Sequence, residues 1–203
     1  SGNYSTAMGI GTNASGNFST AMGYSTSASG EGSTAMGEGT TASGDRSTAM
    51  GNGTDASGIA STAMGDGTNA PSYAETAVGR YNTTYTPASA TAWNTADRLF
   101  VVGNGTGTGV NSSNALTITK DGKMNINDAY DMPTADGTAN FVMSTNGAGV
   151  VSFVDPNTLV TPTTTNTLDG AYDQGGAGAG RVIDAVDGTV AITGEDGIMV
   201  SGT

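Results

Sequence analysis

A 14-residue repeat fills the first part of the chain and constrains its fold more than any other feature. The segment Ser5-Thr6-Ala7-Met8-Gly9 recurs from Ser19, Ser33, Ser47 and Ser61, and a divergent copy begins at Glu75. A second half, Thr12-Asn13-Ala14-Ser15-Gly16, recurs between these copies at the same spacing. Self-similarity at a fixed period is typical of solenoid architectures.

Each half of the repeat alternates with a period of two over about five residues and ends in glycine, which suits a short strand and a turn. Helices are not expected, because Gly and β-branched Thr recur every few residues and no apolar period of 3.6 is present. The repeat therefore predicts a parallel β-solenoid with two short strands per coil, in which identical residues stack about 4.8 Å apart.

Both faces of the first strand are constant in the repeat. Thr and Met share one face, and Ala shares the other with Ser and Gly. We therefore expect both faces to be buried, one in the interior of the coil and the other against a second body. A thin coil buries little apolar area, and another copy in threefold symmetry is the simplest partner. The residues between the strands vary, which predicts exposed bends at positions such as Tyr4, Phe18 and Tyr24.

The repeat resembles the head repeat of trimeric autotransporter adhesins, Asn-Ser-Val-Ala-Ile-Gly followed by a half rich in small residues. Here Thr replaces Val and Met replaces Ile, and Phe18 occupies the Asn position of its copy. The resemblance covers residues 1–79 and implies a left-handed parallel β-roll, three copies of which pack into a head.

Residues 80–97 leave the repeat register and predict a transition that caps the roll. Aromatic residues gather here, and a glycan-stacking site is the functional alternative. The candidate ligand-binding residues of the whole chain are Tyr4, Phe18, Tyr24 and Trp93.

Residues 98–154 predict a β-rich neck or shaft module, and in three copies its hairpins could close into a prism. We expect a strand at Arg98–Val102, a hairpin of 115–119 with 123–126 around Asp121-Gly122, and a second of 141–143 with 150–154 around Asn146-Gly147. The segments 98–106, 113–117 and 133–140 resemble modules of phage tail fibres and of fibre-like bacterial surface proteins. Residues 155–167 predict a linker, and residues 168–203 predict an incomplete Gly-rich β shaft module.

Composition removes several classes of function. The chain has no His and no Cys, so Ser-His-Asp catalysis and zinc sites of the usual ligands are excluded. Its formal net charge of −12 disfavours nucleic acid and anionic membranes as partners. The Gly175–Gly180 run lacks the Lys of a phosphate loop. Pairs such as Asp184 with Asp187 are more typical of turns than of glycosidase carboxylates. No cofactor and no metal are expected.

The sequence thus predicts an all-β homotrimeric fibre: an N-terminal β-roll of 14-residue repeats followed by β-hairpin or β-prism shaft modules. We expect a non-enzymatic fibre on a cell surface, or in a virion tail, that recognises a target-cell component such as a glycan or an outer-membrane protein. The alternatives are a phage tail fibre, an ice- or water-ordering solenoid suggested by the column Thr12, Thr26, Thr40, Thr54 and Thr68, and a glycan hydrolase. We also expect the chain to begin and end within a longer protein.

Overall fold

The computed structural model describes residues 1–135 and 137–159 of the 203-residue chain. The chain divides into a compact unit of residues 1–157 and a second unit from Thr158 onward. The predicted shaft module at 168–203, with its Gly-rich run and acidic pairs, lies outside the described residues, as does the predicted linker beyond residue 159. The described start of that linker contains the one-turn helix α1 (Pro156–Leu159).

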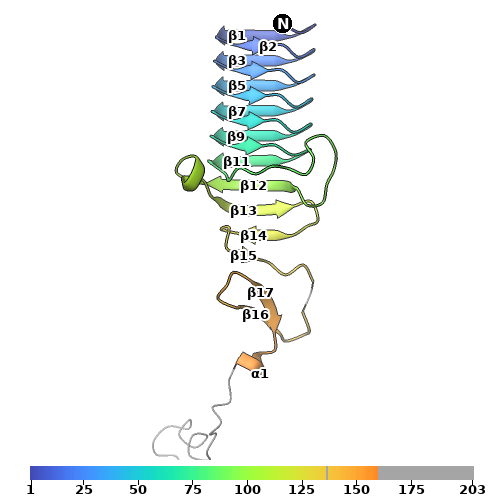
Figure 1. The fold of residues 1–203 in the computed structure, drawn as a ribbon, viewed down its shortest axis with the longest axis vertical. Coiled ribbons are helices and arrows are strands. Elements are labelled where there is room, and N and C mark those ends of the chain that lie inside the picture. The colour runs from blue at the N-terminus through green and yellow to red at the C-terminus, as the bar shows by residue number, and fades with distance from the viewer. Residues whose placement is uncertain (136, 160–203) are drawn as a thin grey trace, which may run out of the picture. The chain divides into compact units, whose positions relative to one another are not determined.

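Each repeat forms one coil with one long and one short strand, so the predicted parallel β-solenoid is confirmed (Figure 1). The second strand is shorter than its five-residue pattern suggests, because a bend at the following Ser-Gly ends it after two residues. The long strands are β1 (Thr6–Ile10), β3 (Thr20–Tyr24), β5 (Thr34–Glu38), β7 (Thr48–Asn52), β9 (Thr62–Asp66) and β11 (Thr76–Arg80). The short strands are β2 (Asn13–Ala14), β4 (Ser27–Ala28), β6 (Thr41–Ala42), β8 (Asp55–Ala56) and β10 (Asn69–Ala70).

The long strands belong to a sheet of ten strands that extends beyond the repeats. β12 (Arg98–Asn104) pairs in parallel with β11, and Val101 lies beside Ala77. The sheet then becomes antiparallel through β13 (Asn114–Thr119), β14 (Met124–Ile126) and β15 (Tyr130–Asp131) (Figure 1). The short strands form a second, five-stranded parallel sheet. The predicted strand at 98–102 is therefore present, and it adds a seventh rung to the long-strand ladder.

The interior of the roll consists of small side chains. One Ala from each long strand, beginning with Ala21, is fully buried, and one Ala from each short strand packs with them. Buried Ser and Thr columns complete the interior, including Thr26, Thr40, Thr54 and Thr68, which are no more than 1% exposed. Four of the five Thr residues that suggested an ice-ordering solenoid therefore face the interior of the coil and are not exposed to solvent.

Glycine is required where adjacent rungs touch. At Gly37, φ is +121°, and an added Cβ would lie 2.0 Å from the carbonyl oxygen of Gly51 in the next rung. Real Cβ atoms do not approach backbone that closely, and side chains at this φ are strained. The Gly at the end of each Ser-Thr-Ala-Met-Gly segment therefore fixes how closely the coils stack.

Both predicted hairpins are present. β13 and β14 pair around Asp121-Gly122, with Leu116 opposite Ile126. β16 (Val142–Thr145) and β17 (Val151–Val154) form a separate two-stranded sheet around Asn146-Gly147. A short 3-10 helix, η1 (Gly109–Asn111), lies between β12 and β13.

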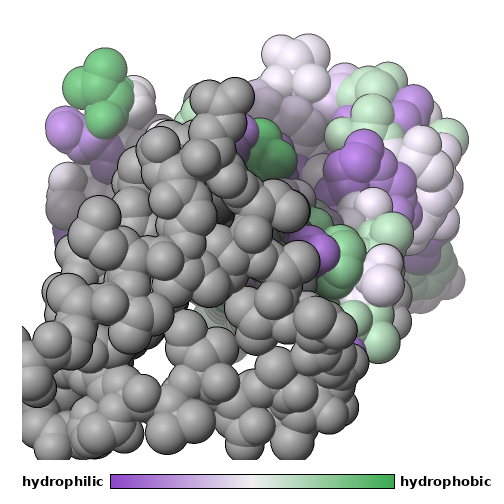
Figure 2. Space-filling model, turned by 90° about the horizontal axis from the view of Figure 1, so that it is seen from below, coloured by the Kyte–Doolittle hydropathy of each residue, from purple (hydrophilic) through white to green (hydrophobic). Residues whose placement is uncertain are grey.

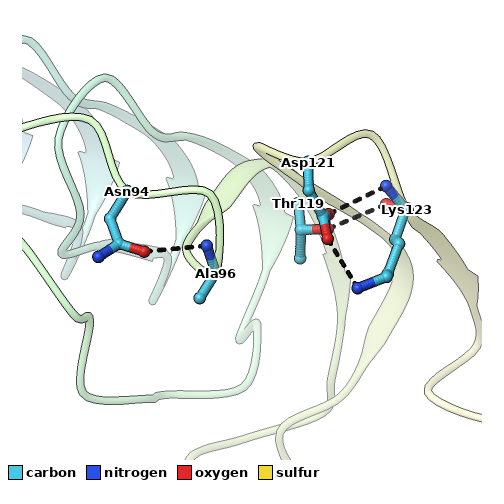
Figure 3. Close-up of polar contacts among 5 residues, drawn as sticks. All are labelled: Asn94, Ala96, Thr119, Asp121 and Lys123. Carbon is cyan, nitrogen blue, oxygen red and sulfur yellow. Dashed lines mark hydrogen bonds and ion pairs between the residues drawn. The ribbon is translucent and has the colours of Figure 1, made fainter.

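The first hairpin has a tightly bonded turn. The Asp121 carboxylate accepts hydrogen bonds from Thr119 Oγ1, from the backbone N–H of Lys123, and from Lys123 Nζ at 2.7 Å (Figure 3). The Lys123 side chain, followed by the Thr119 hydroxyl, lowers the pKa of Asp121 to about 2. A second local contact, from the Ala96 N–H to Asn94 Oδ1, stabilises the loop before β12 (Figure 3).

The segment that follows the repeats runs alongside the roll without forming strands. Its Asn82 side chain pairs with the backbone of Asn69 on the edge strand β10, and the Ala90 carbonyl accepts a hydrogen bond from the Ile59 N–H. The edge of β11, by contrast, is covered by β12. The loop therefore satisfies backbone groups at the edge of the short-strand sheet and at the bends beside it.

Candidate functional site: the outer stripe and the bends

The outward face of the long strands carries Thr and Met in regular columns. In β3, β5, β7 and β9 these side chains are half-buried in a single chain, whereas the Ala between them is fully buried. The sequence predicted two buried faces. The structure assigns Ala and Ser to the interior and leaves Thr and Met turned outward.

These columns continue without interruption onto the strands beyond the repeats. Thr76 lies beside Phe100 and Val78 beside Val102. The same face then passes to β13, β14 and β15 through successive cross-strand pairs. We call this set the outer stripe: Thr6, Met8, Thr20, Met22, Thr34, Met36, Thr48, Met50, Thr62, Met64, Thr76, Val78, Phe100, Val102, Leu116, Ile118, Met124, Ile126 and Tyr130.

The outer stripe contains no charged residue and becomes more apolar along the chain. Contiguous uncharged apolar surface of this kind marks interaction sites in soluble proteins. Met8, Met124, Ile126 and Tyr130 are among the exposed large hydrophobic residues. In Figure 2, which views the molecule from below, hydrophobic and hydrophilic groups lie side by side on the visible described surface. The stripe runs from strand to strand along the ten-stranded sheet, so a partner must follow its length to cover it.

The four predicted ligand-binding residues lie in three places. Tyr4 and Phe18 stack on each other, with ring centroids 5.4 Å apart and ring planes 4° from parallel. Tyr24 is at the opposite end of β3, about 20 Å along the chain from Phe18 at the usual rise per residue. Trp93 lies in the loop before β12. All four are more than half exposed, so each is open to a ligand, but they do not form one site.

The base of the roll contains a buried ionisable cluster that the sequence reading did not single out. Glu75 occupies the column that is Ser in the earlier copies, and it is fully buried. Its Oε2 atom accepts hydrogen bonds from the Ser72 N–H at 3.0 Å and the Tyr85 hydroxyl at 3.1 Å. Burial raises the pKa of Glu75, although these hydrogen bonds and the Arg98 charge oppose it. In the sequence, the replacement of Ser by Glu at this fixed repeat position was the signal that could have revealed the cluster.

Two cations face this cluster from the strands that follow. The Arg98 guanidinium lies 4.3 Å from the centre of the Tyr85 ring. Lys120 Nζ donates a hydrogen bond to Ser72 Oγ at 2.9 Å and lies 5.6 Å from the centre of the Trp93 ring. Burial lowers the pKa of Lys120 and raises that of Tyr85 to about 12. The cluster ties the last coil to the following strands, and it gives Trp93 a structural contact in addition to its exposed surface.

Within residues 1–135 and 137–159, no group of three or more His, Cys, Asp or Glu residues is arranged to hold a metal ion. The same ranges contain no helix with the length and apolar character needed to cross a membrane.

Residues 1–26 and 28–54 match two copies of the YadA head domain repeat. The match does not include the segments that resemble tail-fibre modules. A search of curated proteins returned no match. The matched family is an adhesin family rather than an enzyme family. Residues 1–26 and 28–54 are thus similar to the repeats of trimeric autotransporter adhesin heads.

Proposed function

We propose that the chain is a non-enzymatic homotrimeric adhesin of a cell surface, which binds a component of a target cell. In this proposal residues 1–79 form the head, 80–97 the transition and 98–154 the first part of the neck or shaft. Residues 155–167 and 168–203 stay predictions of a linker and a further shaft module. The match to YadA head repeats supports the adhesin class and an extracellular position, and it gives no support to a virion tail.

The outer stripe carries the proposal of self-association. It is a long, uncharged face in uniform register on a chain whose interior holds mostly Ala, Ser and Thr. Such an interior buries little apolar area, so the roll needs a partner for its Met face. A second and third copy offer the same stripe at the same spacing, and cyclic symmetry lets all three stripes meet at one axis.

Recognition is proposed for the bends, which self-association through the outer stripe leaves available. Tyr4, Phe18 and Tyr24 supply exposed aromatic surface there, and Trp93 supplies it on the loop before β12. Each trimer would carry three copies of every site, and simultaneous contacts with a surface raise overall affinity well above that of a single site. A glycan or an outer-membrane protein of the target cell is the proposed partner.

Cell binding by a labelled protein tests this function. Wild-type protein and a Met50→Asp variant, which is expected to stay monomeric, are offered to bacterial and animal cells, and retention is measured after washing. We expect wild type to remain on at least one cell type and the variant to wash off. Retention of the variant equal to that of wild type, or no retention of wild type on any cell, would overturn the proposal.

A further inference from the structure

One bend of the roll presents a single column of side chains whose identity changes from rung to rung. The column contains Tyr4, Phe18, Gly32, Arg46, Ala60 and Ala74, and each rung adds about 4.8 Å along the roll. All six residues have left-handed backbone conformations, with φ between 53° and 64°. We call this set the bend column.

The aromatic residues of the bend column are not explained by folding. A left-handed φ is unfavourable for bulky residues and easy for Gly, and the next rung uses Gly32 at this position. Tyr4 and Phe18 are also 85% and 59% exposed. The other rungs form the same bend with Gly, Arg or Ala, so the fold does not require two exposed, stacked aromatic rings here, and they point to a function.

The change from Phe18 to Gly32 leaves a slot in the column. Tyr4 covers one face of the Phe18 ring. On the other side, Gly32 has no side chain, and a Cβ placed there would meet only the Cγ atom of Arg46, at 3.8 Å. Phe18 and Arg46 are two rungs apart, which is about 10 Å along the roll. The slot therefore has room for one ring. The Phe18 ring forms one wall, and the aliphatic part of the Arg46 side chain forms the other.

Polar side chains border the slot in the neighbouring column. Asn17 Oδ1 accepts a hydrogen bond from the Asn3 N–H, and Asp45 Oδ1 accepts one from the Glu31 N–H, each at 3.0 Å. The Asp45 side chain therefore reaches toward the rung of Gly32, whereas the Asn17 side chain reaches toward the rung of Tyr4, on the far side of Phe18. Within the described residues, the second Asp45 carboxylate oxygen forms no further hydrogen bond. An acceptor is thus available beside the open aromatic face.

We propose that this slot binds one pyranose ring of a neutral saccharide, stacked on Phe18 and hydrogen-bonded by Asp45 and Arg46. The C–H groups of a sugar face carry partial positive charge and suit the electron-rich face of an aromatic ring. The hydroxyl groups suit the carboxylate and guanidinium groups at the rim. The carboxylates of Glu31 and Asp45 beside a single Arg46 disfavour an acidic sugar. The inference rests on the proposed function and names its ligand class.

The bend column itself supplies the test variants. Gly32→Phe fills the slot with a third ring, and the aromatic residues at positions 4 and 18 show that this backbone accepts one. Phe18→Ala removes the stacking wall. Ala60→Phe introduces the same ring into the same column two rungs from the slot, so it is the matched control. Thermal unfolding of all variants confirms that the roll is intact.

The probes are lactose, N,N′-diacetylchitobiose and a sialylated lactose, with binding to the full chain measured by saturation-transfer NMR and titration. We expect at least one neutral disaccharide to bind, and Gly32→Phe and Phe18→Ala to weaken binding by about tenfold, the loss of one stacking face. Ala60→Phe should bind as wild type does. Binding of the sialylated sugar alone, no binding of any probe, or unchanged binding by Gly32→Phe would overturn the slot.

Cell binding separates this inference from the proposed function. If Gly32→Phe binds the sugar as wild type does and stays on the same cells, the slot is wrong and the adhesin function stands. If wild type binds no cells, the adhesin function fails whether or not the sugar binds in solution. If Gly32→Phe loses both the sugar and the cells while Ala60→Phe keeps both, the slot is the adhesive site.

Discussion

The side-chain amide of Asn82 pairs with the backbone of Asn69, donating to its carbonyl oxygen at 2.9 Å and accepting from its N–H at 2.8 Å. In the preceding coil, the Asp55 N–H donates to the backbone carbonyl of Thr68 in the same manner. Asn82 lies one repeat after Thr68, so its side chain takes the place of the next strand's peptide. The edge strand β10 of the short-strand sheet is therefore hydrogen-bonded by a side chain of the same polypeptide.

Replacing Asn82 with Ala leaves the Asn69 N–H and carbonyl without these partners. We expect a loss of about 1–3 kcal/mol in the free energy of unfolding, the usual cost of an unsatisfied buried polar group. Denaturant unfolding measures it. Asn13→Ala, at an exposed position in β2, is the control and should change stability by less than about 0.5 kcal/mol. Equal effects of the two variants would contradict the capping role.

The interior Ala column should not accept larger side chains. Ala49 is fully buried between the two sheets, and Leu at this position overpacks an interior made of Ala, Ser and Thr. We expect Ala49→Leu to cost about 1–3 kcal/mol, measured by thermal or denaturant unfolding. Ala92→Leu, on the exposed loop, should be nearly neutral. Tolerance of Leu at position 49 would mean that the interior has unfilled space.

Glu75 should make stability depend on pH in an unusual direction. Burial raises its folded-state pKa above the ordinary value of 4.5. The folded state therefore binds a proton more tightly than the unfolded state, and this contribution to stability is full below 4.5 and lost as pH rises through the raised pKa. The melting temperature of wild type relative to Glu75→Gln should rise as pH falls from 7 to about 5. A difference that stays constant across this range would show that Glu75 titrates normally.

The sequence predicted the roll because the 14-residue repeat is strict and the residues within each half of it alternate with a period of two. Ser-Thr-Ala-Met-Gly gives the strand, its faces and the Gly that each contact between coils requires. The hairpins at Asp121-Gly122 and Asn146-Gly147 were predicted by their turn residues. All of these are local signals, which a single sequence carries directly.

Features that depend on long-range pairing were not predictable from the sequence. β12 pairs with β11 although an irregular loop separates them in the sequence, so the 14-residue period does not relate Val101 to Ala77. The Glu75 cluster combines side chains from distant segments such as Tyr85 and Lys120, and only the change from Ser to Glu hinted at it. The Tyr4–Phe18 stack follows from the repeat spacing, but its left-handed backbone and the slot beside it required the structure.

A charge on the outer stripe should prevent self-association without unfolding the coil. Met50 is half-buried on that face in a single chain, so Met50→Asp places a carboxylate where three copies would meet. We expect a folded monomer by circular dichroism and native mass. Asn52→Asp adds the same charge at the exposed end of the same strand and should leave the assembly intact. Assembly by both variants would exclude the stripe as the interface.

The native mass of the wild-type chain tests the central claim most directly. Sedimentation equilibrium over a hundredfold dilution measures it without a known ligand. We predict a species of three times the chain mass of 19.9 kDa that persists on dilution, because the outer stripe needs partners along its whole length. A folded monomer at all concentrations would contradict the account, since the Met face would then be stable in water.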